Sequence, residues 1–321
     1  MEAVTFQLNW EPNGFQAPYF LAREAGLYED EGLDVRFVEG HGSPYAAERA
    51  ATGETTFGLA GASAVLGVQS EGHDPLAVAA VTQKTPAAIY TLRDVFGEPL
   101  EHPDQLAGRT VAPSATKTHA LASQLLSDLG IREEVDLRSV DPHTHHRVEH
   151  QLLDGSVDAA VGVVTNGREL AEEHDRVADE LPIGDYLRVY GMTLVTSREV
   201  TDERPEAVRG FLRATARGWA EATRDPEAAI DALIARNATL ENHRPIETVK
   251  FETAASGLQF TEYVREHGWG AHDPTRWEKL GETISETDLL SGGIEPERAW
   301  TNEFRDRESD AIGEYAEAIG R

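Results

Sequence analysis

Cysteine is absent from this chain of 321 residues, which excludes disulfides, zinc-thiolate sites, thiol nucleophiles and iron–sulfur clusters. Hydrophobic residues make up 40% of the chain and form no run of about 18, so the sequence predicts no membrane-spanning helix. Phosphate-binding loops, nucleophile elbows and zinc-binding helix motifs are also missing. No charged segment followed by an apolar one opens the chain, so we expect either a cytosolic protein or the removal of a leader.

Basic residues are scarce. The chain has 29 Lys and Arg against 57 Asp and Glu, a formal net charge of −28. Its lysines are Lys84, Lys117, Lys250 and Lys279. Such a surface repels nucleic acid and anionic lipid, so neither is expected as a partner. We interpret the charge as a halophilic adaptation, because a short Debye length removes self-repulsion; a basic partner is the alternative.

Short apolar strands alternate with amphipathic helices, which is typical of an α/β protein with mainly parallel sheets. The strands are predicted at residues 4–9, 33–38, 56–59, 77–82, 88–92, 110–112, 135–140, 159–164 and 192–196. The helices are predicted at residues 18–26, 43–52, 63–71, 118–129, 146–154 and 205–222, with a mainly helical tail from residue 227. Ser43 is expected to cap its helix, with proline in the first turn.

The order of these elements predicts two lobes. One α/β series ends near residue 87 and a second ends near residue 190, whereas the region after residue 196 carries no new series and should return to the first. The predicted domains are therefore lobe 1, residues 1–87 plus 196–321, and lobe 2, residues 88–195, joined by two crossover segments. Two crossovers make a hinge, and the cleft between the lobes is the expected small-molecule site.

The segment after the first predicted strand is the strongest local signal for ligand binding. Trp10 stands where the apolar alternation of that strand stops, so it is poorly placed for the core. In a cleft, an indole offers a flat apolar face to a ring, worth roughly 0.5–1.5 kcal/mol beyond area burial. The candidate ligand-binding residues here are Asn9, Trp10, Glu11, Asn13 and Phe15. The alternative is a tryptophan that merely caps the sheet edge.

Two strand-to-helix turns are further candidates. In Gly58–Ser63, Gly61 would let a ligand approach the backbone, although small residues equally let a helix pack on a sheet. In the turn 113–118, hydroxyl and N–H groups could hold an anion at a helix N-terminus. The side chains concerned are Ser114, Thr116 and Lys117. Ordinary helix capping by the hydroxyls of this turn is the alternative.

Histidines cluster after the strand predicted at residues 135–140. His146 and His150 have the i, i+4 spacing of many metal ligands, but no pattern supplies a third ligand. We therefore expect no metal site, with a divalent metal or a ligand contact as the alternative. A loop at the carboxyl end of a strand faces the crevice of a doubly wound sheet, so Asp141 and His143 are candidate ligand-binding residues.

Tyrosines at predicted helix starts and crossovers could form a second aromatic wall, although each is more often a packing residue. Tyr45 begins a predicted helix, and Tyr90 and Tyr190 lie at the two crossovers. We keep Tyr90 and Tyr190 as candidate ligand-binding residues. Glu11 or Glu303 could pair with a ring amine.

The opening of the chain resembles ABC-transporter solute-binding proteins of the thiamine-pyrimidine-precursor type, relatives of sulfonate- and nitrate-binding proteins. Residues 9–13 (NWEPN), 26–28 (GLY) and 32–35 (GLDV) follow the order of the family's opening motif. Similar segments continue along nearly the whole chain, at 46–66 (AAERAATGETTFGLAGASAVL), 152–162 (LLDGSVDAAVG), 204–229 (RPEAVRGFLRATARGWAEATRDPEAA) and 299–306 (AWTNEFRD). The resemblance implies a type II periplasmic-binding-protein fold, with Trp10 stacked on a heteroaromatic ring.

The family also contains a eukaryotic pyrimidine synthase that uses a lysine, a histidine and a cysteine-rich segment. An ungapped comparison places Ala60 and Ala64 at the lysine and histidine positions, and this chain has no cysteine. Where many members have a histidine and a glycine in the opening motif, this chain has Gln16 and Pro18. On these grounds the protein is predicted not to be an enzyme and to need no cofactor.

The prediction is therefore the solute-binding component of an ABC importer. It would capture a small flat heteroaromatic ligand, with a thiamine pyrimidine precursor leading, and its partners would be an ABC permease and ATPase. We expect a monomer. The resemblance implies a place at the extracellular face of the cytoplasmic membrane, held by a lipid anchor outside this sequence. The alternatives are a pyrimidine biosynthetic enzyme, a sensor module, or a binding protein for a flavin or a sulfonate- or nitrate-type anion.

Overall fold

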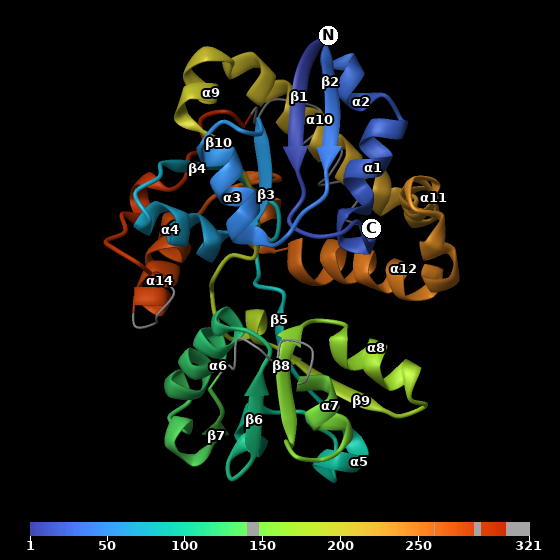
Figure 1. Cartoon of the computed structure of the whole chain (residues 1–321), viewed down its shortest axis with the longest axis vertical. Coiled ribbons are helices and arrows are strands. Elements are labelled where there is room, and N and C mark those ends of the chain that lie inside the picture. The colour runs from blue at the N-terminus through green and yellow to red at the C-terminus, as the bar shows by residue number, and fades with distance from the viewer. Residues whose placement is uncertain (140–147, 260, 286–289, 306–321) are drawn as a thin grey trace. The chain divides into compact units, whose positions relative to one another are not determined.

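The computed structural model describes residues 1–139, 148–259, 261–285 and 290–305 (Figure 1). The chain divides into two compact units. Unit 1 comprises Met1–Lys84, Val189–Gly281 and Leu290–Arg321, and unit 2 comprises Thr85–Arg188 and Glu282–Leu289. Each unit holds one five-stranded sheet with helices, so the predicted α/β class is confirmed.

Unit 1 is built on a sheet of strand order β2-β1-β3-β10-β4. The strands β1, β2 and β3 are parallel, whereas β10 runs antiparallel to both β3 and β4. Their bounds are β1 Glu2–Gln7, β2 Leu33–Val38, β3 Phe57–Gly61, β4 Pro75–Ala80 and β10 Met192–Ser197. The central strand β3 is buried along its whole length, whereas the edge strand β2 alternates buried Leu33 and Val35 with exposed Asp34 and Arg36.

The helices of unit 1 come from both ends of the chain. They are α1 Ala17–Glu24, α2 Leu27–Asp30, α3 Ser43–Ala51, α4 Ala62–Ser70, α9 Arg198–Glu203, α10 Pro205–Arg224, α11 Pro226–Arg236, α12 Arg244–Glu252, α13 Glu262–His267 and α14 Pro274–Ser285, the last of which ends in residues grouped with unit 2. A π-helical segment, Thr253–Gln259, directly follows α12. Most of unit 1 beyond Ser197 is therefore helical.

Aromatic side chains form the centre of the core of unit 1. Phe57 of β3 stacks on Phe211 of α10, with ring centroids 4.1 Å apart and planes 7° apart. Phe6 of β1 meets Phe211 edge-on at 5.2 Å. On the other side of the sheet, a Cβ at Gly58 would lie 2.4 Å from the Ala46 carbonyl oxygen, so glycine is needed for α3 to pack against β3.

Unit 2 has the same architecture, with strand order β7-β6-β8-β5-β9. Its strands are β5 Ala87–Leu92, β6 Thr110–Pro113, β7 Asp136–Leu137, β8 Ala159–Val163 and β9 Ala178–Pro182. Its helices are α5 Arg93–Phe96, α6 Thr116–Asp128, α7 Val148–Leu153 and α8 Asn166–Glu173. The strands β6, β7 and β8 are parallel, and β5 is antiparallel to β8 and β9.

Several local predictions need correction. The edge strand β9 was not predicted, because its sequence ADELP lacks apolar alternation and carries two acids and a proline. The strand expected at 135–140 is only Asp136–Leu137, and residue 140 lies outside the described residues. Gly42, not Ser43, is the N-cap residue of α3, and no side chain caps that helix. Among the described residues, no helix combines the length and apolar character needed to cross a bilayer.

Candidate functional site

The carboxyl ends of the parallel strands of unit 1 define the candidate site. Trp10 follows β1, the turn Glu39–Gly42 follows β2, and Gly61 is the last residue of β3. Since these three strands are neighbours and parallel, the three segments lie along one edge of the sheet. In open α/β sheets, this edge is where ligands bind.

Trp10 lies at this edge and is the most exposed tryptophan among the described residues. Its relative exposure is 53%, whereas Trp219, Trp269 and Trp277 are each at most 2% exposed in the core. Its backbone is nevertheless fixed, because the Trp10 carbonyl oxygen accepts the Gly40 N–H at 3.3 Å and the Asn9 carbonyl oxygen accepts the Gly42 N–H at 2.7 Å. Trp10 is therefore an exposed indole on an anchored backbone.

The asparagines of the same loop bond within it. Asn13 caps the 3₁₀ turn Gly14–Gln16, since its Oδ1 accepts the Phe15 N–H at 3.0 Å while Gln16 Oε1 accepts the Asn13 N–H at 3.0 Å. Gln16 Nε2 then donates to Asn9 Oδ1 at 2.9 Å. Both asparagines thus stabilise the loop that carries Trp10. The Asn13-x-x-Gln16 spacing is that of a capping box and is readable in the sequence.

The other two candidates of this loop differ in exposure. Glu11 is exposed, and its carbonyl oxygen accepts from Asn13 Nδ2 at 3.1 Å. Phe15 is half-buried and packs against the apolar core of unit 1. Of this pair, only the Glu11 carboxylate is on the solvent side of the loop.

Two residues that sequence analysis missed hold the far end of the loop. Glu247 of α12 is 3% exposed, and its Oε2 accepts the Gly14 N–H at 2.5 Å. Lys250, one turn later, places Nζ 3.0 Å from Glu247 Oε1. These residues lie more than two hundred positions from the loop in sequence, and no local pattern links them to it.

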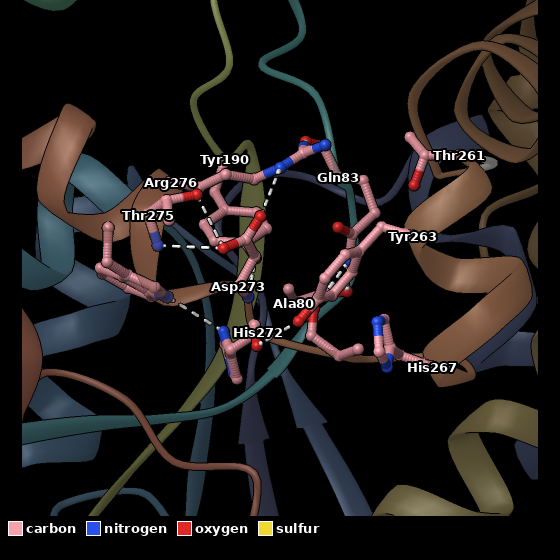
Figure 2. A network of polar contacts seen from close by, with 12 residues as sticks. Ala80, Gln83, Tyr190, Thr261, Tyr263, His267, His272, Asp273, Thr275 and Arg276 are labelled. Atoms are coloured by element: carbon pink, nitrogen blue, oxygen red, sulfur yellow. Dashed lines mark hydrogen bonds and ion pairs between the residues drawn. The ribbon is translucent and has the colours of Figure 1, made fainter.

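Tyr190 belongs to a buried polar network in unit 1 (Figure 2). Its hydroxyl accepts the Asp273 N–H, and its ring meets the His272 ring at 5.9 Å between centroids. Arg276 donates to the Gln83 carbonyl oxygen. Burial raises the pKa of Tyr190 above its usual range. Tyr190 is 1% exposed, so its hydroxyl acts within this network.

The strand-to-helix turn of unit 2 brings its three predicted residues together. Ser114 N–H donates to the Val161 carbonyl oxygen at 2.8 Å, Thr116 is the exposed first residue of α6, and Lys117 follows it. Thr118 reaches back to accept the Ala115 N–H at 3.0 Å, so one helix-end group is satisfied by capping. Lys117 is partly buried, and desolvation lowers the pKa of its ammonium group to about 8.

Tyr90 lies in the core of unit 2. It is fully buried in β5, and its hydroxyl donates to Glu149 Oε1 at 3.3 Å. Burial first, and the Glu149 charge second, raise the pKa of Tyr90 well above its usual range. The Tyr90 ring packs in the core and its hydroxyl is bonded to Glu149, so neither faces solvent.

The remaining candidates lie elsewhere. Asp141 and His143 lie outside the described residues. His150 of α7 is exposed, and within the described ranges no group of three His, Asp or Glu has metal-binding geometry. Glu303 is exposed; its N–H donates to Thr301 Oγ1 at 3.1 Å and its carbonyl oxygen accepts from Arg209 at 3.0 Å.

The chain shares its fold with a solved binding protein. The periplasmic aliphatic sulphonate binding protein SsuA from Escherichia coli superposes with a TM-score of 0.71 at 16% identity, covering 93% of this chain and 92% of that one. The fold is therefore that of the periplasmic binding proteins, as predicted.

The chain belongs to the NMT1/THI5 like family, whose model matches residues 13–229. The riboflavin-binding protein RibY of Chloroflexus aurantiacus is 24% identical over 95% of this chain and 86% of the relative. The formylaminopyrimidine-binding protein of Halalkalibacterium halodurans is 23% identical over 94% of this chain and 90% of the relative. The resemblance seen in the sequence is thereby confirmed.

The prediction that the protein is not an enzyme is contradicted by its relatives, several of which are named as enzymes. A 4-amino-5-hydroxymethyl-2-methylpyrimidine phosphate synthase of Legionella pneumophila is 23% identical over 72% of both chains, and yeast synthases match over 71% of this chain. The family therefore contains enzymes as well as binding proteins. Alanines at two positions and a lack of cysteine do not place this chain outside the enzymes.

Proposed function

We propose that this protein is a solute-binding protein for a small flat heteroaromatic ligand of the pyrimidine or flavin kind, and that Trp10 stacks on the ligand ring. The observation that carries the proposal is the 53% exposure of Trp10 at the carboxyl edge of the unit 1 sheet. An indole left in water at a ligand-binding edge costs free energy that stacking against a ring recovers. Two relatives that match nearly the whole chain are named for binding riboflavin and formylaminopyrimidine.

The test is equilibrium binding of riboflavin, formylaminopyrimidine and taurine in high salt. We expect one of the two ring compounds to bind, and Trp10→Ala to weaken its binding by roughly 30-fold, the equivalent of about 2 kcal/mol of stacking and burial. Trp10→Phe should retain most of the affinity because it keeps a ring.

The control is Leu129→Ala, which removes a similarly exposed apolar residue at the C-terminal end of α6, the end opposite Lys117. That variant should bind as the wild type does. Equal affinity of Trp10→Ala and the wild type for the ring compound would refute the stacking role. Binding of taurine alone would instead favour an anion ligand and the turn containing Ser114, Thr116 and Lys117.

The same proposal includes delivery of the ligand to an ABC permease outside the cytoplasmic membrane. Its support is the fold shared with periplasmic ABC binding proteins. The measurements are fractionation of the expressing cell and ligand uptake into proteoliposomes that contain the cognate permease and ATPase. Uptake that does not depend on this protein would contradict the importer role.

A second candidate function is pyrimidine phosphate synthesis, favoured by the synthases among the relatives. The resemblance assigns the amine that would hold pyridoxal phosphate to the position of Ala60, which is buried in β3. An alanine side chain has no amine to form a Schiff base, so this position does not fit the cofactor. Among the four lysines, Lys84 is the one to test, since the chain passes from unit 1 into unit 2 directly after it. A Schiff-base absorbance with pyridoxal phosphate that Lys84→Ala abolishes would support this candidate.

A further inference from the structure

We propose that Glu247 is a positioning residue for the ligand-binding loop, residues 9–16. It sets ligand affinity by fixing the backbone that carries Trp10. The proposal rests on the proposed function, because it assigns the placement of the same indole. Glu247 itself is 3% exposed, so its carboxylate acts on the loop and not on the ligand.

The first argument is the contact between the carboxylate and the loop backbone. Glu247 Oε2 accepts the Gly14 N–H at 2.5 Å, and Lys250 Nζ lies 3.0 Å from the other oxygen. Gly14 begins a 3₁₀ turn, whose first N–H groups have no partner inside the turn. A buried carboxylate with a lysine partner supplies that acceptor as a charge-assisted hydrogen bond.

The second argument is the closeness of the two backbones. A Cβ on residue 14 would lie 1.9 Å from the Glu247 carbonyl oxygen and 2.9 Å from Lys250 Cβ. Only glycine lets the loop reach α12 at this point. The loop therefore lies directly on α12, and the carboxylate bond fixes where along the helix it rests.

The third argument is the continuity of hydrogen bonds from Gly14 back to Trp10. The Asn13–Gln16 capping box joins Gly14 to its neighbours, and Gln16 Nε2 donates to Asn9 Oδ1 at 2.9 Å. At the other end, the turn after β2 holds Asn9 and Trp10 through their carbonyl oxygens. Trp10 thus lies between two anchors, one of which is Glu247.

A purely stabilising role explains the arrangement less well. Buried ion pairs are on average neutral or costly compared with apolar residues of the same volume, so stability alone does not favour Glu247 and Lys250. Apolar residues in place of Glu247 and Lys250 would leave the Gly14 N–H without its acceptor. Preorganised loops bind more tightly because less order is lost when the ligand binds.

The experiment compares two double variants of the full chain. Glu247→Leu with Lys250→Met removes the acceptor and both charges, whereas Glu247→Gln with Lys250→Met keeps a side-chain oxygen for Gly14. Each is measured for riboflavin and formylaminopyrimidine affinity and for hydrogen exchange of peptides covering residues 8–16 without ligand. The matched control is Glu31→Leu with Arg213→Met, which removes a less buried ion pair of unit 1, with an N–O distance of 2.6 Å.

We expect the leucine variant to lose about tenfold or more in affinity and its loop amides to exchange about tenfold faster, as for one lost hydrogen bond to a charged group. The glutamine variant should stay within about threefold of the wild type, and the Glu31 control should keep both values. If the leucine variant does not fold, Gly14→Ala tests the same contact from the loop side and should give the same loss.

The outcomes separate this proposal from the proposed function. Wild-type affinity together with unchanged loop exchange in the leucine variant overturns the positioning role. Faster loop exchange with unchanged affinity also overturns it, because affinity then does not depend on the loop. If the wild type binds neither probe, the proposed function fails, and loop exchange alone still decides whether Glu247 fixes the backbone.

Discussion

His272 is a buried histidine held in its neutral form. It is fully buried, and its Nδ1 accepts the Trp277 Nε1–H at 3.1 Å, so the proton of the neutral ring is on Nε2. Its backbone is held as well, because the Tyr263 hydroxyl donates to the His272 carbonyl oxygen (Figure 2). Asn302 Nδ2 donates to the same oxygen. Burial, and to a lesser extent the Arg305 charge, lower the pKa of His272 to about 3.

This depressed pKa predicts acid sensitivity. Below its ordinary pKa near 6.5 the unfolded chain binds a proton at His272, whereas the folded chain binds one only below about 3. Stability is therefore lost as the pH falls through this window, by ~2 kcal/mol at pH 5 relative to pH 7. Urea unfolding at both pH values should show a smaller loss for His272→Gln, while exposed His150→Gln keeps the wild-type loss. Equal losses in all three proteins would contradict the assignment.

At the same scale, the sequence indicated that Trp10 lies outside the core, but not which residues hold its loop. Trp10 was predictable because it ends the apolar alternation of its strand. Asn9 and Asn13 were predicted as ligand contacts, yet their side chains bond to Gln16 and Phe15 of the same loop. Glu247 was not predictable, because its contact with Gly14 arises only when the chain folds back.

Among the elements, β9 forms through its pairing with a distant strand, although its own sequence has low strand propensity. It pairs with β5 at the edge of the unit 2 sheet. Its Glu180 carboxylate accepts the N–H groups of Thr165 and Gly167 at 3.2 and 2.9 Å, and so caps the N-terminus of α8 from a neighbouring strand. Sequence patterns detect local caps, such as Ser197 before α9, but not a cap that lies fifteen residues away.

Removal of this cap should weaken unit 2. Glu180→Ala removes the acceptor of the Thr165, Gly167 and Arg168 N–H groups and should lower the free energy of unfolding by about 1–3 kcal/mol. Glu180→Gln keeps an oxygen acceptor and should cost less. Urea unfolding monitored by circular dichroism measures both, with Glu172→Ala as the control, since Glu172 makes an exposed ion pair with Arg168 on the same helix. If Glu180→Ala is as stable as the control Glu172→Ala, Glu180 does not stabilise α8 as a cap.

For the whole molecule, alternating strands and helices were enough to predict the fold class. Prediction failed at the edge strand β9, whose pairing with β5 depends on residues far away in the sequence. The helices after Ser197 were expected to return to the first series because they had no sheet of their own. In the structure, Phe211 of α10 stacks on Phe57 of β3.

The net charge of −28 belongs to the molecule as a whole and predicts a dependence on salt. The Debye length falls from about 10 Å at 0.1 M salt to about 3 Å at 1 M, which screens repulsion between dispersed carboxylates. Raising KCl from 0.1 to 2 M should therefore stabilise the folded chain by a few kcal/mol and raise Tm by roughly 5–10 °C. Scanning calorimetry measures Tm at each salt concentration. Sucrose of equal osmolality is the control, because it raises Tm without screening charge. A Tm that rises no more in KCl than in sucrose would show that the acidic surface is not an adaptation to salt.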